Sequence, residues 1–329
     1  MPITQYGSGS SVRPLAESAL LAAITVLLMF LGTFLPVAGF VIALLWPIPV
    51  MVVILRHGVR YGTMTVLVTV ALAAMFLGVL QALFAGVVVV GMIGVVFGVG
   101  LRLRWRAFAL MGAATGVIAV SFFLTLMVFG PLIGIDLMDQ MQTLMAQSMD
   151  TVVTMYTAAG VDPDALSETQ MQLGRTVELM QVVFPAVLMI SAAFYALWTY
   201  GVTRLTLPRL GYHVPALPPF ANWRAPYWVA ILFLGAYFSL AMLGMEAQTY
   251  LSLLAENILF LTNAAYMIFG AALLYFLLRR VIASRWFAGI LCALLAVNPL
   301  GVIVLPLAAI LDSGLNFRQY FRTEGANDQ

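Results

Sequence analysis

Long apolar runs separated by short polar loops make up most of this chain. A helix needs about 20 apolar residues to cross the hydrocarbon layer of a bilayer, and the pattern predicts eight such helices. The second run contains Pro47 and Pro49, which lack backbone donors, so we expect a break there. A further run at 286–311 is interrupted by prolines and fits either one kinked span or a helical hairpin that returns to the side it came from. The predicted spans are 15–35, 40–55, 61–80, 84–101, 107–129, 182–205, 228–245 and 253–278.

This pattern predicts an all-α fold, a polytopic transmembrane bundle of about eight spans plus the proline-broken last segment. One polar stretch, 130–181, divides the bundle, and it holds seven of the thirteen acidic residues and a single basic one. Within it, 136–156 places methionine, leucine and valine at helical spacing opposite acids and glutamines, which predicts an amphipathic helix. A second helix is expected to run from about residue 163 into the sixth span. An acidic polar face disfavours anionic lipid, so we expect either a lid on the protein's outer face or a tethered loop.

The charged residues predict an orientation. Arginines cluster in loops between the runs, and such clusters face the cytoplasm. A cytoplasmic amino terminus puts these clusters inside and the acidic stretch outside, in a bacterial cytoplasmic (inner) membrane. The side of the carboxyl terminus depends on the last run and stays open. The predicted organisation is a tail at 1–14, spans one to five at 15–129, the extracytoplasmic insert at 130–181, the remaining spans at 182–311, and a tail at 312–329.

Composition narrows the class of protein. The chain is 63% hydrophobic and 9% charged, whereas soluble domains carry about 25% charged residues. A net charge of +2 gives no reason to expect a nucleic-acid partner, and one cysteine excludes an internal disulfide. The sequence has no phosphate-binding loop, no nucleophile elbow and no spacing typical of metal ligands. We therefore expect no enzyme activity, no metal and no cofactor, and any use of ATP would need another chain.

A few polar residues lie at or near membrane depth, where such groups are costly and often functional. The candidates for ligand binding are Gln81, Glu178, Glu256 and Asn263. Glu256 and Asn263 share one helical face, so they fit a common cavity. Alternatively, Glu256 lies in the outer headgroup layer and Asn263 makes a hydrogen bond between helices. His57 lies in an arginine-bearing loop and is expected to be solvated.

Small residues recur at four-residue spacing, at Ala19/Ala23, Gly94/Gly98 and Gly112/Gly116. Such pairs let helices approach closely in lipid. They fit packing within this chain, or, for Ala19 and Ala23, a docking face for another membrane subunit.

Four segments resemble the YybS-like family of uncharacterised bacterial membrane proteins. This resemblance extends over nearly the whole chain and implies a membrane protein without defining an activity. The segments are 215–224 (PALPPFANWR), 256–261 (ENILFL), 276–280 (FLLRR) and 311–318 (LDSGLNFR).

The first half is also similar, more distantly, to the substrate-binding S components of energy-coupling factor importers. The similarity rests on 36–39 (PVAG), 46–50 (WPIPV) and 58–62 (GVRYG). It implies a six-helix bundle for the first six spans, a vitamin or metal ligand bound on the outer side, and a coupling subunit docked on Ala19 and Ala23. The acidic insert and about three further apolar segments depart from that family, and no ligand-binding residue carries over.

Together these features predict a non-catalytic transport subunit that binds a small solute and resembles an S component. The alternative is a scaffold or assembly protein of the bacterial envelope without transport activity. The expected partners are membrane lipid, a coupling or other membrane subunit and a small-molecule ligand.

Overall fold

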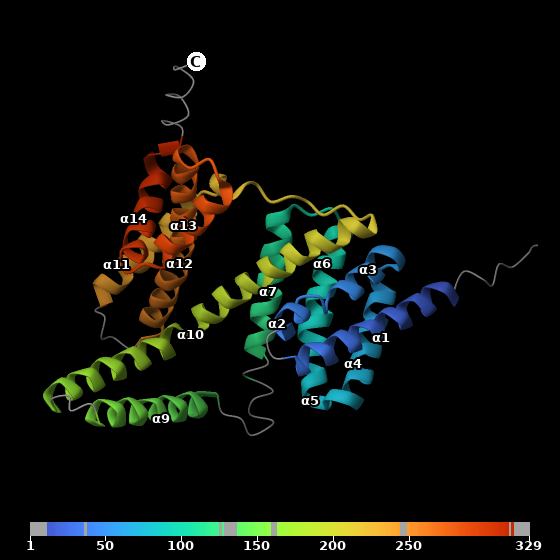
Figure 1. Ribbon diagram of the computed structural model, residues 1–329, viewed down its shortest axis with the longest axis horizontal. Coiled ribbons are helices and arrows are strands. Elements are labelled where there is room, and N and C mark those ends of the chain that lie inside the picture. Colours follow the sequence, from blue (N-terminus) through green and yellow to red (C-terminus); the bar gives the residue numbers. More distant parts are fainter. Residues whose placement is uncertain are drawn as a thin grey trace, which may run out of the picture. The chain divides into compact units, whose positions relative to one another are not determined.

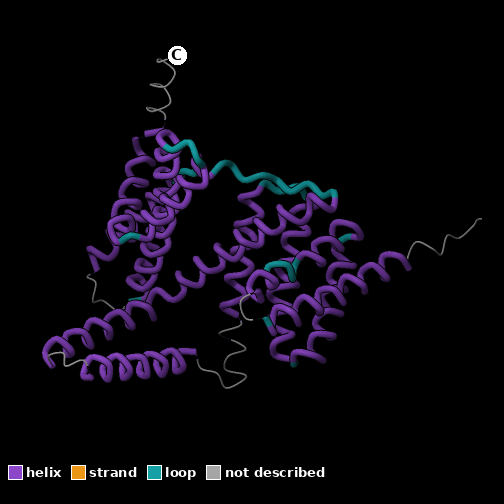
Figure 2. Tube along the Cα trace, in the orientation of Figure 1, coloured by secondary structure: helices purple, strands orange, loops and turns teal. Residues whose placement is uncertain are grey.

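The computed structural model describes residues 12–35, 38–124, 127, 137–158, 163–243, 249–315 and 317–318. These residues form helices joined by turns and loops, and none of them lies in a strand (Figures 1 and 2). The chain divides into two compact units. Unit 1 comprises Met1–Met141 and Ser191–Leu217, and unit 2 comprises Gln142–Ile190 and Pro218–Gln329. The helix α10 (Pro163–Thr206) contributes residues to both units.

In unit 1, the predicted break in the second run is confirmed. The chain leaves α2 (Ala38–Ala43), turns through residues 44–47, and enters α3 (Ile48–His57), whose first turn contains Pro49. The fourth run differs from a regular helix, because η1 (Ala82–Met92) is a π-helix between α5 (Val79–Gln81) and α6 (Ile93–Arg102). The remaining helices of this unit are α1 (Val12–Phe34), α4 (Val59–Leu77), α7 (Ala107–Leu124), the end of α10 and η3 (Leu207–Leu210).

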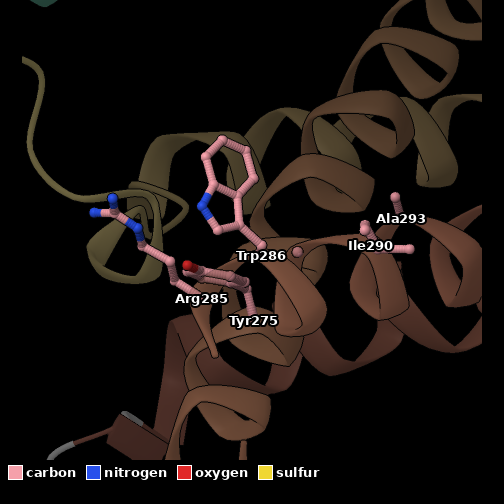
Figure 3. Close-up of a pocket in the computed structure, with 6 residues that line it drawn as sticks. Tyr275, Arg285, Trp286, Ile290 and Ala293 are labelled. Atoms are coloured by element: carbon pink, nitrogen blue, oxygen red, sulfur yellow. The ribbon is translucent and has the colours of Figure 1, made fainter. Parts of the chain in front are cut away.

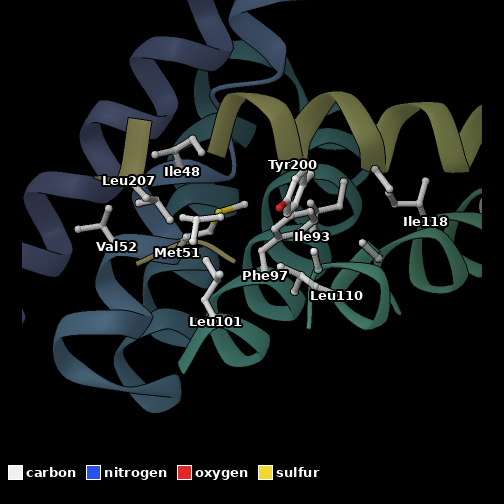
Figure 4. Packing of buried hydrophobic residues seen from close by; sticks show 14 of the residues in the cluster. Ile48, Met51, Val52, Ile93, Phe97, Leu101, Leu110, Ile118, Tyr200 and Leu207 are labelled. Carbon is white, nitrogen blue, oxygen red and sulfur yellow. The ribbon is translucent and has the colours of Figure 1, made fainter. Parts of the chain in front are cut away.

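The core of unit 1 forms around α3, the most deeply buried helix of this unit. Met51 from α3, Phe97 from α6 and Tyr200 from α10 meet there, and all three are at most 2% exposed (Figure 4). Gly94 and Gly98 on α6 lie against Val50 and Ile54, where an added Cβ would come within 2.9 Å of side-chain atoms. This glycine pair therefore serves packing within the chain.

Unit 2 contains α11 (Tyr227–Leu243), α12 (Tyr250–Val281), α13 (Arg285–Val297) and α14 (Pro299–Leu315), which lie side by side (Figure 1). α12 packs against the other three. α13 and α14 are bent by 102° where Asn298 separates them. A bend of this size fits a broken span or a re-entrant hairpin, so both interpretations of the last run stay predictions.

The amphipathic helix expected in the acidic insert is present as α9 (Leu137–Ala158), and α10 runs continuously from the insert into the sixth span. In the described residues, seven helices are long and apolar enough to cross a membrane, or eight if α13 and α14 count as one broken span. α11 is apolar but shorter, with 17 residues. The predicted all-helical membrane bundle is thus confirmed.

Candidate functional site

The four polar residues singled out by the sequence do not all lie in one unit. Gln81 lies in unit 1, where its Nε2 donates to Thr33 Oγ1 (3.1 Å) and its side chain is exposed. Glu178, on α10, and Glu256 and Asn263, on α12, belong to unit 2. Glu256 is half-buried and Asn263 is exposed. The Glu178 side chain is not among the described ones, so a cavity shared by these residues stays a prediction.

Asn257, the neighbour of Glu256, has a structural role that the sequence did not specify. Its Nδ2 donates to the Val182 carbonyl oxygen (2.8 Å), and its Oδ1 accepts from the Ala186 N–H (2.9 Å). These two backbone groups flank Pro185, which has no N–H and disturbs the hydrogen bonding of α10. Backbone groups in lipid need a hydrogen-bond partner. Asn257 supplies one to both of these groups in the turn of α10 that contains Pro185.

The structure forms a pocket of about 480 Å³ at the arginine-bearing end of unit 1. Three segments distant in sequence meet there: the end of α3, the turn after α6 and the chain after η3. The Tyr200 hydroxyl donates to the Pro215 carbonyl oxygen and so holds the third segment against α10. The pocket is lined by Leu55, Leu101, Arg104, Trp105, Tyr212, His213 and Pro215.

Arg104 occupies a position that usually belongs to glycine. Its φ is 55°, in the left-handed region, where it ends α6. The Arg104 N–H donates to the Leu101 carbonyl oxygen (3.1 Å) and the Trp105 N–H to that of Gly100 (2.9 Å), the pattern of a Schellman motif. A side chain in this conformation costs about 1–2 kcal/mol relative to glycine. The backbone strain therefore places a guanidinium at a pocket where glycine would end the helix more easily.

A network of charged side chains adjoins the pocket through Tyr212, whose hydroxyl accepts from Arg56 Nε (2.9 Å). Arg56 Nη1 lies 3.5 Å from Glu17 Oε2, and His57 Nε2 lies 2.8 Å from the same oxygen. Arg13 Nε pairs with Glu17 Oε1 (3.2 Å). Glu17 is thus surrounded by basic groups, whereas none of the described residues that line the pocket carries a carboxylate.

The expectation that His57 is merely solvated was wrong, because its side chain is 16% exposed and is paired with Glu17. Two sequence signals could have revealed this pair. Arg13 and Glu17 have the i,i+4 spacing of a helical ion pair. In addition, successive spans run in opposite directions, which brings the start of the first span to the same end as the close of the second.

The lining of this pocket is chemically suited to an anion. Arg104 has no carboxylate within ion-pair distance among the described residues, and the lining also contains an imidazole and two aromatic side chains. Guanidinium groups bind carboxylates and phosphates with two parallel hydrogen bonds. Of the residues described, no three of the types His, Cys, Asp and Glu form a group able to hold a metal ion. Such a lining would suit a small acidic or aromatic solute.

Arg224, Arg280 and Arg318 of unit 2 also lie close together, but they contact other groups of the protein. Arg318 Nε lies 3.3 Å from Asp312 Oδ2, and Arg224 Nη2 donates to the Asp312 carbonyl oxygen (2.8 Å). The guanidiniums of Arg280 and Arg318 lie 5.3 and 5.9 Å from the centre of the Phe276 ring. Three of the four segments that carry the YybS-like resemblance contribute to this cluster. The cluster joins the end of α14 to the loop that precedes α11.

Ala19 and Ala23 are exposed on α1, while Ser18 and Ala22 are buried. Gly112 and Gly116 are exposed too, with no atom within 4 Å of an added Cβ. In the described structure, neither pair packs against this chain as Gly94 and Gly98 do. A docking role for Ala19 and Ala23 stays a prediction.

The apolar helices and their polar ends define a multi-pass helical integral membrane protein. Residues 23–313 match the model of a family described as "Predicted membrane protein (DUF2232)", and the chain belongs to that family. It is similar to "Uncharacterized protein YybS" of Bacillus subtilis (strain 168), with 24% identity over 313 residues, which cover 93% of this chain and 97% of that relative. No solved structure matches. The YybS-like resemblance is confirmed, and the likeness to S components stays a prediction.

Proposed function

We propose that the protein is a non-catalytic, solute-binding subunit of a membrane transport system, and that the pocket of unit 1 binds a small acidic solute. The observation that carries the proposal is the composition of this pocket, with Arg104, His213, Trp105 and Tyr212 around about 480 Å³ and no carboxylate among the described lining residues. Small-molecule sites enclose about 300–1,000 Å³. The Arg104 backbone supports a functional role, because strained residues tend to cluster at binding sites.

The position of the pocket modifies the expectation drawn from S components. That resemblance implied a ligand bound on the outer side, whereas the pocket lies among the loops that carry Arg56, Arg104 and Arg106. The charge pattern predicts that these loops face the cytoplasm. In our proposal, the solute therefore enters the pocket from the arginine-bearing side of the membrane. The side from which the solute enters also determines the direction of transport.

Replacing Arg104 by glycine should weaken binding and stabilise the fold. Loss of a hydrogen bond to a charged group lowers affinity by about 10- to 100-fold. Glycine relieves the left-handed backbone, so the free energy of unfolding should rise by up to about 1 kcal/mol. Small acids released from protein purified in mild detergent are identified by mass spectrometry, and their binding is then measured by calorimetry.

Arg106→Ala is the matched control, because Arg106 is exposed, carries the same charge and does not line the pocket. It should keep the affinity of the wild type. If Arg104→Gly retains the same acids at the same affinity, the pocket is not the solute site. Arg104→Ala, which keeps the strained backbone but lacks the guanidinium, separates the two effects.

The second candidate, a membrane scaffold, is favoured by one observation, the exposure of Ala19 and Ala23 on α1. A small-residue face is suited to a close helix–helix contact in lipid. A photocrosslinking residue at Ala23 should then yield an adduct with a second chain of defined mass in intact cells. The same residue at Leu67, an exposed large position on α4, is the control. Equal crosslinking from both positions would contradict a specific docking face.

A further inference from the structure

A groove of about 530 Å³ lies on the surface of unit 2, lined by residues of α12 and α13. Its lining is almost entirely apolar, and the few polar groups lie at one end, called here the polar end (Figure 3). Arg285, Trp286 and Tyr275 lie together at the polar end, and Ile290 and Ala293 lie farther along α13. This groove is separate in sequence from the solute pocket, and the inference drawn from it does not depend on the proposed function.

The floor follows one face of α13. Trp286, Gly289, Ile290 and Ala293 have the spacing i, i+3, i+4 and i+7, which places them in one stripe roughly 10 Å long. A Cβ added at Gly289 would meet no atom within 4 Å, so the floor is open rather than filled. Val297, one turn beyond Ala293, is 80% exposed and continues the apolar surface. Such a floor suits a hydrocarbon chain.

The polar end offers donors that the protein does not use. The Arg285 guanidinium lies 6.0 Å from the centre of the Trp286 ring. No carboxylate of the described residues pairs with Arg285. The hydrogen bonds found in the described part of the chain do not involve the Tyr275 hydroxyl or the Trp286 indole N–H. The sequence has no acidic residue between Glu256 and Asp312, whereas Arg279 and Arg280 precede Arg285 closely. This end is therefore positively charged and suited to an anion.

We propose that this groove binds one anionic phospholipid, with its phosphate on Arg285 and an acyl chain along Gly289, Ile290 and Ala293. Each half of the groove excludes a simpler occupant. A free phosphate would leave the apolar floor uncovered, and a second apolar helix would leave the donors of Arg285, Tyr275 and Trp286 without acceptors. An anionic phospholipid satisfies both halves. Basic pockets between membrane helices on the cytoplasmic side are known to bind acidic headgroups, and tryptophan and tyrosine favour the headgroup layer.

Native mass spectrometry of the full chain in detergent tests the proposal, with phosphatidylglycerol and phosphatidylcholine titrated separately. We expect one tightly bound phosphatidylglycerol and a clear preference over phosphatidylcholine. Arg285→Gln should reduce the affinity for phosphatidylglycerol about fivefold and remove most of the preference. Gly289→Leu, whose Cβ would meet no atom within 4 Å, should weaken binding of both lipids because its side chain occupies the floor. Arg60→Gln, an exposed arginine of unit 1, should leave both affinities unchanged.

Three results would overturn the proposal. One is an unchanged preference for phosphatidylglycerol in Arg285→Gln, which removes the headgroup contact. The second is unchanged lipid binding in Gly289→Leu together with loss of a co-purifying subunit, which would assign the groove to a partner helix. The third is full competition of inorganic phosphate with phosphatidylglycerol, which would assign the site to a free anion. The Arg285→Gln result stands even if Gly289→Leu fails to fold.

Discussion

Replacing Arg318 by methionine is expected to destabilise unit 2 by about 3–5 kcal/mol. Arg318 Nε lies 3.3 Å from Asp312 Oδ2, and the two side chains are 7% and 3% exposed. Without the guanidinium, the Asp312 carboxylate stays buried and loses its cation, which costs more than an intact pair contributes. The substitution also removes the hydrogen bond from Arg318 Nη1 to the Ala221 carbonyl oxygen (2.6 Å). Arg318 then loses its connection to the short 3₁₀ helix η4 (Phe220–Asn222).

Cys292 supplies the measurement, because it is the only cysteine of the chain and is buried in unit 2. A thiol reagent reaches it when this unit opens, so the labelling rate follows the free energy of opening. A loss of about 3 kcal/mol should raise this rate roughly 100-fold.

Two further variants show whether the ion pair is responsible. Arg209→Met removes an exposed arginine of unit 1 and should leave the labelling rate of Cys292 unchanged. The double variant Asp312→Leu/Arg318→Met should be labelled more slowly than Arg318→Met, because it leaves no buried charge behind. Labelling of Arg318→Met at the wild-type rate would mean that this ion pair contributes nothing to unit 2.

The sequence predicts the helices well where one local signal determines them. Pro47 and Pro49 marked the break before α3, and the apolar spacing at 136–156 marked α9. The π-helix at Ala82–Met92 was not predicted, because its run is apolar on every side and the spacing contains no register signal. The interruption between α13 and α14 was predicted but its angle of 102° was not, since a proline shows where a helix can break but not by how much.

The candidate site was harder to predict, because it depends on contacts between distant segments. Arg104 and His213 line one pocket although more than one hundred residues separate them. The sequence drew attention to Glu256, whereas its neighbour Asn257 makes the contact with α10. Adjacent helical residues point about 100° apart. Whether Glu256 or Asn257 contacts α10 therefore depends on which face of α12 meets Pro185. Apolar periodicity cannot supply that information when every face is apolar.

The arginines of the two units have different surroundings, and we expect different effects on ligand binding and on stability when they are replaced. In unit 2, Arg224 and Arg318 donate to the protein's own carbonyl and carboxylate oxygens. In unit 1, Arg56 is held by Glu17 and Tyr212, whereas Arg104 faces a pocket without a carboxylate. We therefore expect substitutions at Arg318 to act on folding and substitutions at Arg104 to act on ligand affinity.

A large effect of a small substitution is expected at Gly270, where α12 meets the backbone of α14. A Cβ at Gly270 would lie 2.1 Å from the Leu305 carbonyl oxygen and 2.6 Å from its carbonyl carbon. These are backbone atoms and cannot rotate away as a side chain can, so even alanine must push the two helices apart. Overpacking usually costs about 1–3 kcal/mol, and a backbone clash belongs at or above the upper end. We expect Gly270→Ala to destabilise unit 2 by about 3 kcal/mol.

Cys292 reports this change directly, because its thiol lies 3.3 Å from the carbonyl oxygen of Ala271, the residue after Gly270. Labelling of Cys292 should accelerate roughly 100-fold in Gly270→Ala and more in Gly270→Leu. Gly235→Ala on α11 is the matched control, because a Cβ there meets no atom within 4 Å. That control should be neutral or stabilise its helix by up to about 1 kcal/mol. Equal labelling of the two alanine variants would mean that α12 and α14 do not approach each other through Gly270.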